Sequence, residues 1–338
     1  MGAFFYAFIA IIIICVFTYL FIFINGYKNI KWYNTPPSEG KFADSNGKKI
    51  FYRVKGKGGD VVVVLNAIGS SQAEWWPIQN EIGQKCRMIT FDRPGYDWST
   101  SDEEVKPISS IVDELNIILK FEKIRKPVYL VAHGTGAYYA GYYAKNNPEK
   151  VMGILFVNPL PFHYSKWKEA INNIDECPDL EQTATKKRNL ASKGIYKLSS
   201  PFRGYKLDKR YKRHIIEHYS RTSNYDTMIN DLEQLENAMN ELNADGKFPE
   251  IPVRVLYPSG ESLIRNWVRN GINEYSARQL QRVYEDLSKD VIKITPHSTS
   301  MEVFGSGEHI HLSKPDIIVE EIRQMINVKK HDKKGQKI

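Results

Sequence analysis

The sequence predicts an α/β fold, a doubly wound, mostly parallel sheet with helices on both faces, preceded by one N-terminal transmembrane helix. Continuous runs of β-branched residues, such as Val61–Leu65, are typical of strands buried on both faces of a parallel sheet. Segments with helical periodicity alternate with these runs. The first 26 residues are almost entirely apolar. These three observations carry the prediction.

The predicted elements follow one another in the order that such a sheet requires. Predicted strands cover Lys49–Val54, Val61–Leu65, Arg87–Phe91, Val128–Ala132, Val151–Val157, Val253–Tyr257 and Ser300–Phe304. Predicted helices cover residues 107–122, 137–145, 274–288 and 315–327. Parallel strands end at the same edge of a sheet, so we expect function at their carboxyl ends.

Residues 1–26 are predicted to be a transmembrane anchor. Residues 3–24 carry no charge, and as a helix they span roughly 33 Å, enough to cross a bilayer core. The basic start and cleavage site of a signal peptide are not evident, and Tyr6 does not fit a myristoylation motif. Lys28 and Lys31 follow the apolar run. The positive-inside rule then predicts a single-pass protein of the cell membrane with a cytoplasmic body.

The rest of the chain divides into a linker, a large domain and a tail. Residues 27–47 are polar and contain two prolines, which predicts a juxtamembrane linker. Residues 48–328 form the predicted α/β domain, and residues 329–338 a basic tail without regular structure. Within the domain, residues 164–249 are strandless and predict a helical cap, in which Asp231–Leu242 forms one amphipathic helix.

Charge is concentrated in the predicted cap. The chain has a net charge of +8, and residues 186–213 hold eleven basic residues against Asp208 as the single acidic one. Either a solvated helical surface or a surface that docks on anionic lipid explains this cluster. We expect membrane lipid as a partner through residues 3–24 and this basic surface. We expect no nucleic acid, because no recognised binding motif accompanies the charge.

The segment Val131–Ala137 has the pattern of a nucleophile elbow, which is a strand, a tight turn and a helix. Such an elbow holds an oxygen nucleophile at its centre in a strained backbone conformation, between small residues that let strand and helix approach. Ala132 and Gly136 supply the small residues, and Gly134 occupies the central position.

Together with other segments, this elbow resembles the α/β-hydrolase superfamily over roughly residues 40–328. The other segments are Leu65–Ser71 with Trp75, similar to the oxyanion loop, Phe91–Ser99, similar to an Asp-Arg-x-Gly-x-Gly-x-Ser signature with Asp97 at its second glycine, and Gly307–Pro315, similar to the terminal histidine motif. The resemblance implies an α/β-hydrolase fold with a helical cap insertion.

The resemblance also implies where a catalytic triad would lie, and those positions do not hold one. Gly134 stands at the nucleophile position and has no side chain to attack a carbonyl. Asn158 stands at the acid position and carries no charge. Counting seven residues back from Pro315 places Glu308 at the histidine position, with His309 one residue away. Neighbouring residues in a loop generally point in different directions.

Other residues give the expected site its remaining parts. The pocket and oxyanion-equivalent residues are Asn66, Ala67, Trp75 and Thr135, the last through its backbone amide. A catalytic alternative recruits Thr135 or Ser262 as nucleophile, His309 as base and Glu261 as acid. This catalytic alternative requires an oxygen or sulfur atom of Ser, Thr, Cys or Asp within hydrogen-bonding reach of His309.

Metal and cofactor chemistry are not expected. His309 and His311 together with Glu308 suggest ligands, but no third ligand with suitable spacing stands out. His133, inside the elbow, is interpreted as a packed histidine. We therefore expect no metal and no cofactor.

The predicted function is that of a membrane-anchored, hydrolase-like protein without serine-hydrolase catalysis, which binds a small hydrophobic ligand or a protein partner. One alternative is an active hydrolase of ester or lipid-like substrates with a non-standard catalytic constellation. Another is a structural partner with a vestigial pocket.

Overall fold

The structure is a computed structural model, and it describes residues 2–33, 35–45, 47–100, 107–177, 179–198, 202, 204–243 and 247–335. The chain divides into two compact units, Met1–Ser38 and Glu39–Ile338. Each unit is described by itself.

The first unit contains the helix α1 (Gly2–Tyr33). Its segment Phe4–Phe21 has a mean hydropathy of 2.6, and α1 is long and apolar enough to cross a membrane by length and composition. The helix continues past residue 26, where the predicted anchor ends. No proline occurs before Pro36 to end it, so the first part of the predicted linker is helical.

The second unit is built on one sheet, which has eight strands within the described residues. In spatial order they are β1 (Gly40–Ser45), β2 (Lys48–Lys55), β4 (Arg87–Phe91), β3 (Val61–Leu65), β5 (Val128–His133), β6 (Val151–Val157), β7 (Val253–Pro258) and β8 (Ser298–Val303). The pairs β1–β2 and β2–β4 are antiparallel, and every other neighbouring pair is parallel. The predicted fold class is confirmed.

The strand β1 corrects the predicted linker. Residues 40–45 pair with β2, with Phe42 opposite Phe51. They form an edge strand in which Ala43 is buried and most other side chains are exposed. An edge strand that buries little apolar surface has no continuous apolar run, so its sequence is easily interpreted as a linker.

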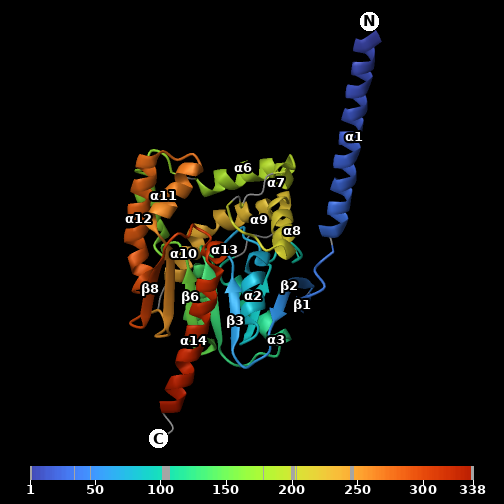
Figure 1. Ribbon diagram of the computed structural model, residues 1–338. Helices are drawn as coiled ribbons and strands as arrows, with labels where there is room; N and C mark the ends of the chain where they lie inside the picture. The colour runs from blue at the N-terminus through green and yellow to red at the C-terminus, as the bar shows by residue number, and fades with distance from the viewer. Residues whose placement is uncertain are drawn as a thin grey trace. The chain divides into compact units, whose positions relative to one another are not determined.

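Helices cover both faces of the sheet (Figure 1). On one face, α2 (Trp76–Ile82) and α14 (Pro315–Gly335) pack against Val62 and Val64 of β3. On the other face, α3 (Ser110–Phe121) and α4 (Gly136–Asn146) pack against Val63 and Leu65. Side chains alternate between the faces of a strand, and β3 is apolar on both, so it lies at the centre of two cores.

Six helices within the described residues lie between β6 and β7, and we call them the inserted helices. They are α5 (Tyr164–Ile171), α6 (Leu180–Ser192), α7 (Ile195–Leu198), α8 (Lys209–Tyr219), α9 (Thr222–Glu233) and α10 (Leu235–Asn243). Figure 1 shows α6 to α9 along one end of the sheet. The predicted single helix Asp231–Leu242 is wrong, because the chain leaves helical pairing at Gln234, and α10 then turns its apolar residues to α4.

The remaining helices also refine the prediction. They are α11 (Gly260–Arg269), α12 (Glu274–Ile292) and α13 (Ile310–Ser313). The helix α11 was not predicted, because it is short and begins within the turn-forming sequence Pro258-Ser259-Gly260. The helix α14 continues to Gly335, well into the predicted basic tail. Lysine is a good helix former, which explains the extension. Residues 336–338 lie outside the described chain.

Candidate functional site

The turn after β5 depends on two glycines. Gly134 has φ = +54°, in the left-handed region, and its amide donates to the carbonyl of Val157 at 3.1 Å. Gly136 begins α4 so close to β3 that an added Cβ would lie 2.2 Å from the carbonyl oxygen of Leu65. A strained residue between a strand and a closely packed helix is the geometry that a nucleophile elbow requires.

The loop after β3 faces this turn. An added Cβ on Gly134 would lie 3.1 Å from the Cβ of Ala67. The hydroxyl of Thr135 accepts a hydrogen bond from the amide of Ile68 at 2.7 Å, and Thr135 is buried. Asn66 is also buried, and its Oδ1 has no hydrogen-bond partner among the described residues. Thr135 therefore fixes the loop in place, and this hydroxyl is not positioned as a free nucleophile.

Asn158 serves as a structural link. It lies directly after β6 with φ = +47°. Its Oδ1 accepts a hydrogen bond from the hydroxyl of Tyr284 at 2.7 Å, and its Nδ2 donates to the backbone carbonyl of Glu308 at 3.1 Å. The carboxylate of Glu308 accepts a bond from Asn266 of α11 at 3.3 Å. The side chain of Glu308 therefore points to α11, whereas its backbone is bonded to the strand ends.

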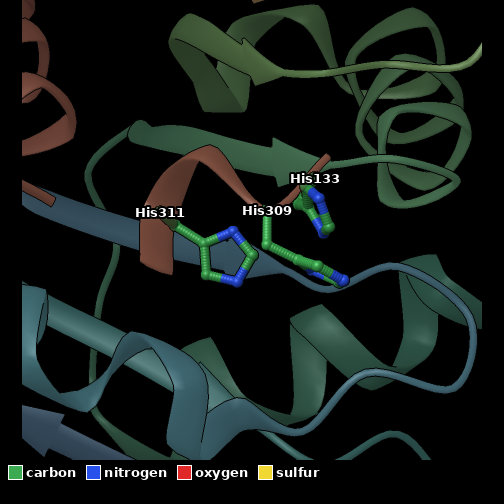
Figure 2. Close-up of side chains that lie close together, drawn as sticks. All are labelled: His133, His309 and His311. Carbon is green, nitrogen blue, oxygen red and sulfur yellow. The ribbon is translucent and has the colours of Figure 1, made fainter. Parts of the chain in front are cut away.

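Three histidines meet beside the turn (Figure 2). His133 is the last residue of β5, and His309 and His311 lie at the start of α13. Ring centroids are 4.5 Å apart for His133 and His311 and 5.5 Å apart for His133 and His309. His309, next to the position that residue counting selected, therefore belongs to the same cluster as His133, which precedes the turn.

A buried carboxylate completes this cluster. Glu74 is fully buried and accepts hydrogen bonds from the amide of Ser71 (3.1 Å), the hydroxyl of Tyr219 (2.7 Å) and Nε2 of His311 (2.8 Å). Burial alone would raise the pKa of Glu74, but the hydrogen bond and charge of His311 outweigh it and lower the pKa to about 2. Glu74 is therefore a buried carboxylate whose charged form is stabilised by its hydrogen-bond donors.

Burial disfavours the charged form of the two most buried imidazoles of this cluster. Burial holds the pKa of His133 well below its ordinary value, and neighbouring imidazoles reinforce the effect. Burial also lowers the pKa of His311, despite the hydrogen bond to Glu74. One ring nitrogen from each of the three histidines lies within 4.8 Å of those of the other two. The fold thus brings His133, from a distant part of the chain, to His309 and His311, a neighbour that spacing along the sequence did not indicate.

Aromatic side chains cover the cluster. The indole of Trp75 stacks on His311 with centroids 4.5 Å apart, and Trp75 is fully buried, so it is a core residue and does not line an open pocket as predicted. Phe202 and Tyr205, which precede α8, contact the ring of His309 edge-on at 5.3 Å and 5.9 Å. The inserted segment therefore packs against His309, which keeps 22% of its side chain exposed.

The other residues expected to act in catalysis lie elsewhere. Glu261 is 62% exposed and pairs with Arg278 at 3.1 Å. The hydroxyl of Ser262 is bonded to Ser259 at 2.9 Å, within the first turn of α11. Within the described part of the chain, the ring of His309 forms no hydrogen bond with a serine, threonine, cysteine or aspartate.

A second buried cluster was missed by the sequence analysis. His218 of α8 bonds Oδ2 of Asp97 through Nδ1 at 2.7 Å and the carbonyl of Gly69 through Nε2 at 3.0 Å. Asn224 of α9 donates to Oδ1 of Asp97 at 2.9 Å. Asp97 has φ = +47°, and it stands where the signature has glycine, which is the one sequence signal that pointed here. This cluster, which we call the His218 clamp, fastens the inserted helices to the loops after β3 and β4.

Comparisons with known proteins agree with this architecture. A family model described as the alpha/beta hydrolase fold matches residues 60–184. Among curated proteins, the chain is 28% identical over 105 residues to the uncharacterized protein YqjL of Bacillus subtilis (strain 168), which covers 31% of this chain and 42% of that protein. It is 33% identical over 72 residues to the uncharacterized protein C23C11.06c of Schizosaccharomyces pombe, a match that covers 21% of this chain and 14% of that protein. The matches span less than half of either relative.

Solved structures share the fold over most of this chain. An epoxide hydrolase, VrEH1 from Vigna radiata, matches with a TM-score of 0.62 at 17% identity, over 86% of this chain and 98% of that one. A loop variant of the haloalkane dehalogenase DbeA from Bradyrhizobium elkanii also has a TM-score of 0.62, at 15% identity, over 87% and 98%. By its sheet, by these likenesses and by the family model, this chain is a protein of the α/β-hydrolase fold.

Proposed function

We propose that this chain is a membrane-anchored protein that uses the α/β-hydrolase fold for binding and does not carry out serine-hydrolase catalysis. The observation that supports this most directly is Gly134, which occupies the strained centre of the turn and has no side chain. Loss of a whole triad costs roughly a million-fold in rate in a well-studied serine protease. Asn158 is committed to hydrogen bonds with Tyr284 and Glu308, so it does not orient a base.

The packing above the turn also favours a binding role. Phe202 and Tyr205 pack edge-on against His309, and the hydroxyl of Tyr219 donates to Glu74. One small cavity lies between α4 and the junction of α9 and α10, beside Tyr139 and Asp231. It has room for about one water molecule. This packing over His309 and Glu74 favours a surface that binds a partner over a pocket at the turn that binds a large ligand.

We expect the wild-type protein to show no labelling by a fluorophosphonate probe and no hydrolysis of short-chain aryl esters above buffer, and Gly134→Ser to remain equally inactive. The new Cβ would lie 3.1 Å from Ala67 at a φ of +54°, and the ring of His309 is 4.0 Å from Glu74, too far for an orienting hydrogen bond. The same substitution should lower the free energy of unfolding by about 1–3 kcal/mol through backbone strain. In-gel fluorescence, ester assays and thermal melts provide the measurements.

Gly134→Ala is the matched control, because it adds the same Cβ without the hydroxyl. Equal loss of stability in the alanine and serine variants would assign that loss to the backbone. Stoichiometric labelling of the wild type would contradict the proposed function. Esterase activity from Gly134→Ser alone would show that a working base is already in place.

The alternative of a non-standard active hydrolase has one observation in its favour. The imidazole of His309 lies beside His133, which precedes the turn, and its Nδ1 is 4.0 Å from the carboxylate of Glu74. A general base likewise combines a histidine near the elbow with a neighbouring carboxylate. Among the described residues, this arrangement lacks an oxygen or sulfur nucleophile. The fluorophosphonate labelling experiment distinguishes an active hydrolase from the proposed binding protein.

The basic surface supports a role at the membrane. Exposed lysines and arginines lie on α6 and α8 and between them, and they include Lys186, Lys187, Lys193, Lys206, Lys209, Lys212 and Arg213. Arg203, counted in the same cluster, lies outside the described residues. Each basic residue near an anionic leaflet contributes about 1 kcal/mol. With α1 as an anchor, this surface would bind anionic lipid headgroups on the cytoplasmic side that Lys28 and Lys31 predict.

We expect the full-length protein to stay in the membrane pellet after alkaline carbonate washing, because α1 is apolar over Phe4–Phe21 and long enough to span the bilayer. A variant that lacks residues 3–24 should bind membranes only at low salt, because exposed charges are screened within about 10 Å at 0.1 M salt. Immunoblots of pellet and supernatant measure both. Release of the full-length chain by carbonate would refute the anchor.

A further inference from the structure

The histidine cluster brings together side chains from two distant segments of the chain. His133 ends β5, at the centre of the sheet, whereas His309 and His311 come from the loop and short helix after β8 (Figure 2). His133 and His311 are 3% and 2% exposed. The fold therefore brings three imidazoles together. Two of them, His133 and His311, occupy no position of the expected catalytic triad.

Each of these imidazoles has an unused nitrogen. Nδ1 of His133, His309 and His311 is buried and has no hydrogen-bond partner among the described residues. A buried polar atom without a partner costs free energy, and most such atoms in proteins are paired. Three unpaired nitrogens in one cluster therefore indicate a shared partner.

The partners of Nε2 show which nitrogen of each ring carries the proton and which has a free lone pair. Nε2 of His311 faces the Glu74 carboxylate at 2.8 Å, and Nε2 of His133 faces the carbonyl of Glu308 at 3.3 Å. Both partners only accept hydrogen bonds, so each Nε2 carries the proton. Nδ1 of both rings is then an unprotonated nitrogen with a free lone pair, which is the form of histidine that binds a metal ion.

Glu74 supplies the matching negative charge. Metal-binding histidines usually donate their other ring N–H to a carboxylate or a backbone carbonyl, which fixes the ring and raises its basicity. His311 has the first kind of partner in Glu74, and His133 has the second kind in Glu308. The carboxylate of Glu74 also lies 4.0 Å from Nδ1 of His309, so it offsets the charge of a cation bound near all three rings.

The spacing fits an ion after a small adjustment. Nitrogens that bind zinc at about 2.0–2.1 Å in a tetrahedral site lie about 3.3 Å from one another. One ring nitrogen from each histidine lies within 4.8 Å of those of the other two, so no pair of these nitrogens needs to close by more than about 1.5 Å to reach this tetrahedral spacing. His309 has 22% of its side chain exposed and is the ring with room to turn.

We propose that His133, His309 and His311 bind one divalent first-row transition-metal ion, with Glu74 as the carboxylate that orients His311. Imidazole nitrogens favour zinc, iron, nickel and copper over magnesium and calcium, which prefer oxygen ligands. Three protein nitrogens leave a fourth position for water or another small ligand. This site does not depend on the absence of serine-hydrolase catalysis and goes beyond the binding role proposed above.

The test is a titration of the full-length protein, purified in detergent without a histidine tag and treated with a chelator. Zinc binding is followed by calorimetry, and cobalt binding by its visible absorption. We expect one ion per chain. His309→Gln should abolish the cobalt absorption, and Glu74→Gln should weaken zinc binding by about 10–100-fold. His163→Gln, at a half-exposed histidine outside the cluster, should bind like the wild type.

Three outcomes would contradict the proposed metal site. One is a wild-type protein that binds neither ion. Another is a His309→Gln variant that binds both ions as the wild type does. The third is a His163→Gln variant that loses binding to the same extent as His309→Gln. His309 is the least buried of the three rings, so its variant is the one chosen to keep the fold, which circular dichroism checks. If that variant unfolds, the wild-type stoichiometry and cobalt spectrum decide by themselves.

Discussion

Replacing Arg93 by methionine is expected to lower the free energy of unfolding by about 3–5 kcal/mol, because it removes one partner from a buried charge network. Arg93 follows β4 and is 9% exposed. Its Nη1 donates to the hydroxyl of Tyr139 at 2.6 Å and to Asp231 at 3.2 Å, and its Nε lies 3.7 Å from Glu114. Without the guanidinium, two largely buried carboxylates lose their counter-charge.

Methionine keeps most of the apolar volume of the arginine stem, so the loss reports the charge and not a cavity. Urea denaturation in detergent measures the change. Arg278→Met is the matched control, since Arg278 pairs with Glu261 and Glu274 on the surface with 47% of its side chain exposed. Exposed pairs contribute little, and no measurable change is expected. Similar effects in both variants would contradict the argument from burial.

The His218 clamp is expected to make stability depend on pH. Both ring nitrogens of His218 face acceptors, Asp97 and the carbonyl of Gly69. Burial by itself lowers the pKa of His218, but the charge and hydrogen bond of Asp97, with the Gly69 carbonyl, outweigh it and leave the pKa raised. The folded protein therefore holds a proton that the unfolded chain releases near about pH 6.5.

A raised pKa in the folded state gives stability that is complete below the unfolded value and is lost as the pH rises through the folded value. At about pH 6, His218→Gln should be less stable than the wild type by about 3–5 kcal/mol, as expected when a buried pair is broken. The difference should shrink as the pH is raised to about 9. Thermal melts across this range measure it.

Other titratable groups face His218, and the comparison removes their contribution. Tyr96 stacks on the ring, Tyr219 lies edge-on against it, and the charge of Glu74 reaches it. These groups are present in both proteins, so the difference isolates His218. His297→Gln, at an exposed histidine, should not alter the wild-type pH profile. A constant difference between wild type and His218→Gln at every pH would refute the clamp.

The central strands were predictable because their sequences are apolar on both faces. β3, β4 and β6 have the predicted bounds, since few other structures suit a short β-branched run between turns. The edge strand β1 was harder to predict from the sequence. β1 buries little more than Ala43, and its pairing with β2 is a backbone interaction that leaves almost no pattern in the side chains.

The site was only half predictable. The position of Gly134 in its turn follows from local sequence, because small residues at fixed spacing are what the turn requires. Whether Glu308 or His309 joins the cluster depends on the orientation of one peptide group in the loop. Hydrogen bonds from the side chains of Asn158 and His133 to the backbone carbonyl of Glu308 fix that orientation. The meeting of His133 with His311 depends on the order of strands in the sheet, which spacing along the chain does not reveal.

The inserted helices also have a consequence for how the chain matures during synthesis. Ile154 of β6 pairs with Val253 of β7, so the strand that covers this edge of β6 leaves the ribosome about 100 residues later. At about 5–20 residues per second, the edge of β6 waits about 5–20 s for its neighbour. An apolar, unpaired strand edge is prone to aggregate. Helices form from local contacts within microseconds, so those encoded in this interval can shield the nascent edge before β7 arrives.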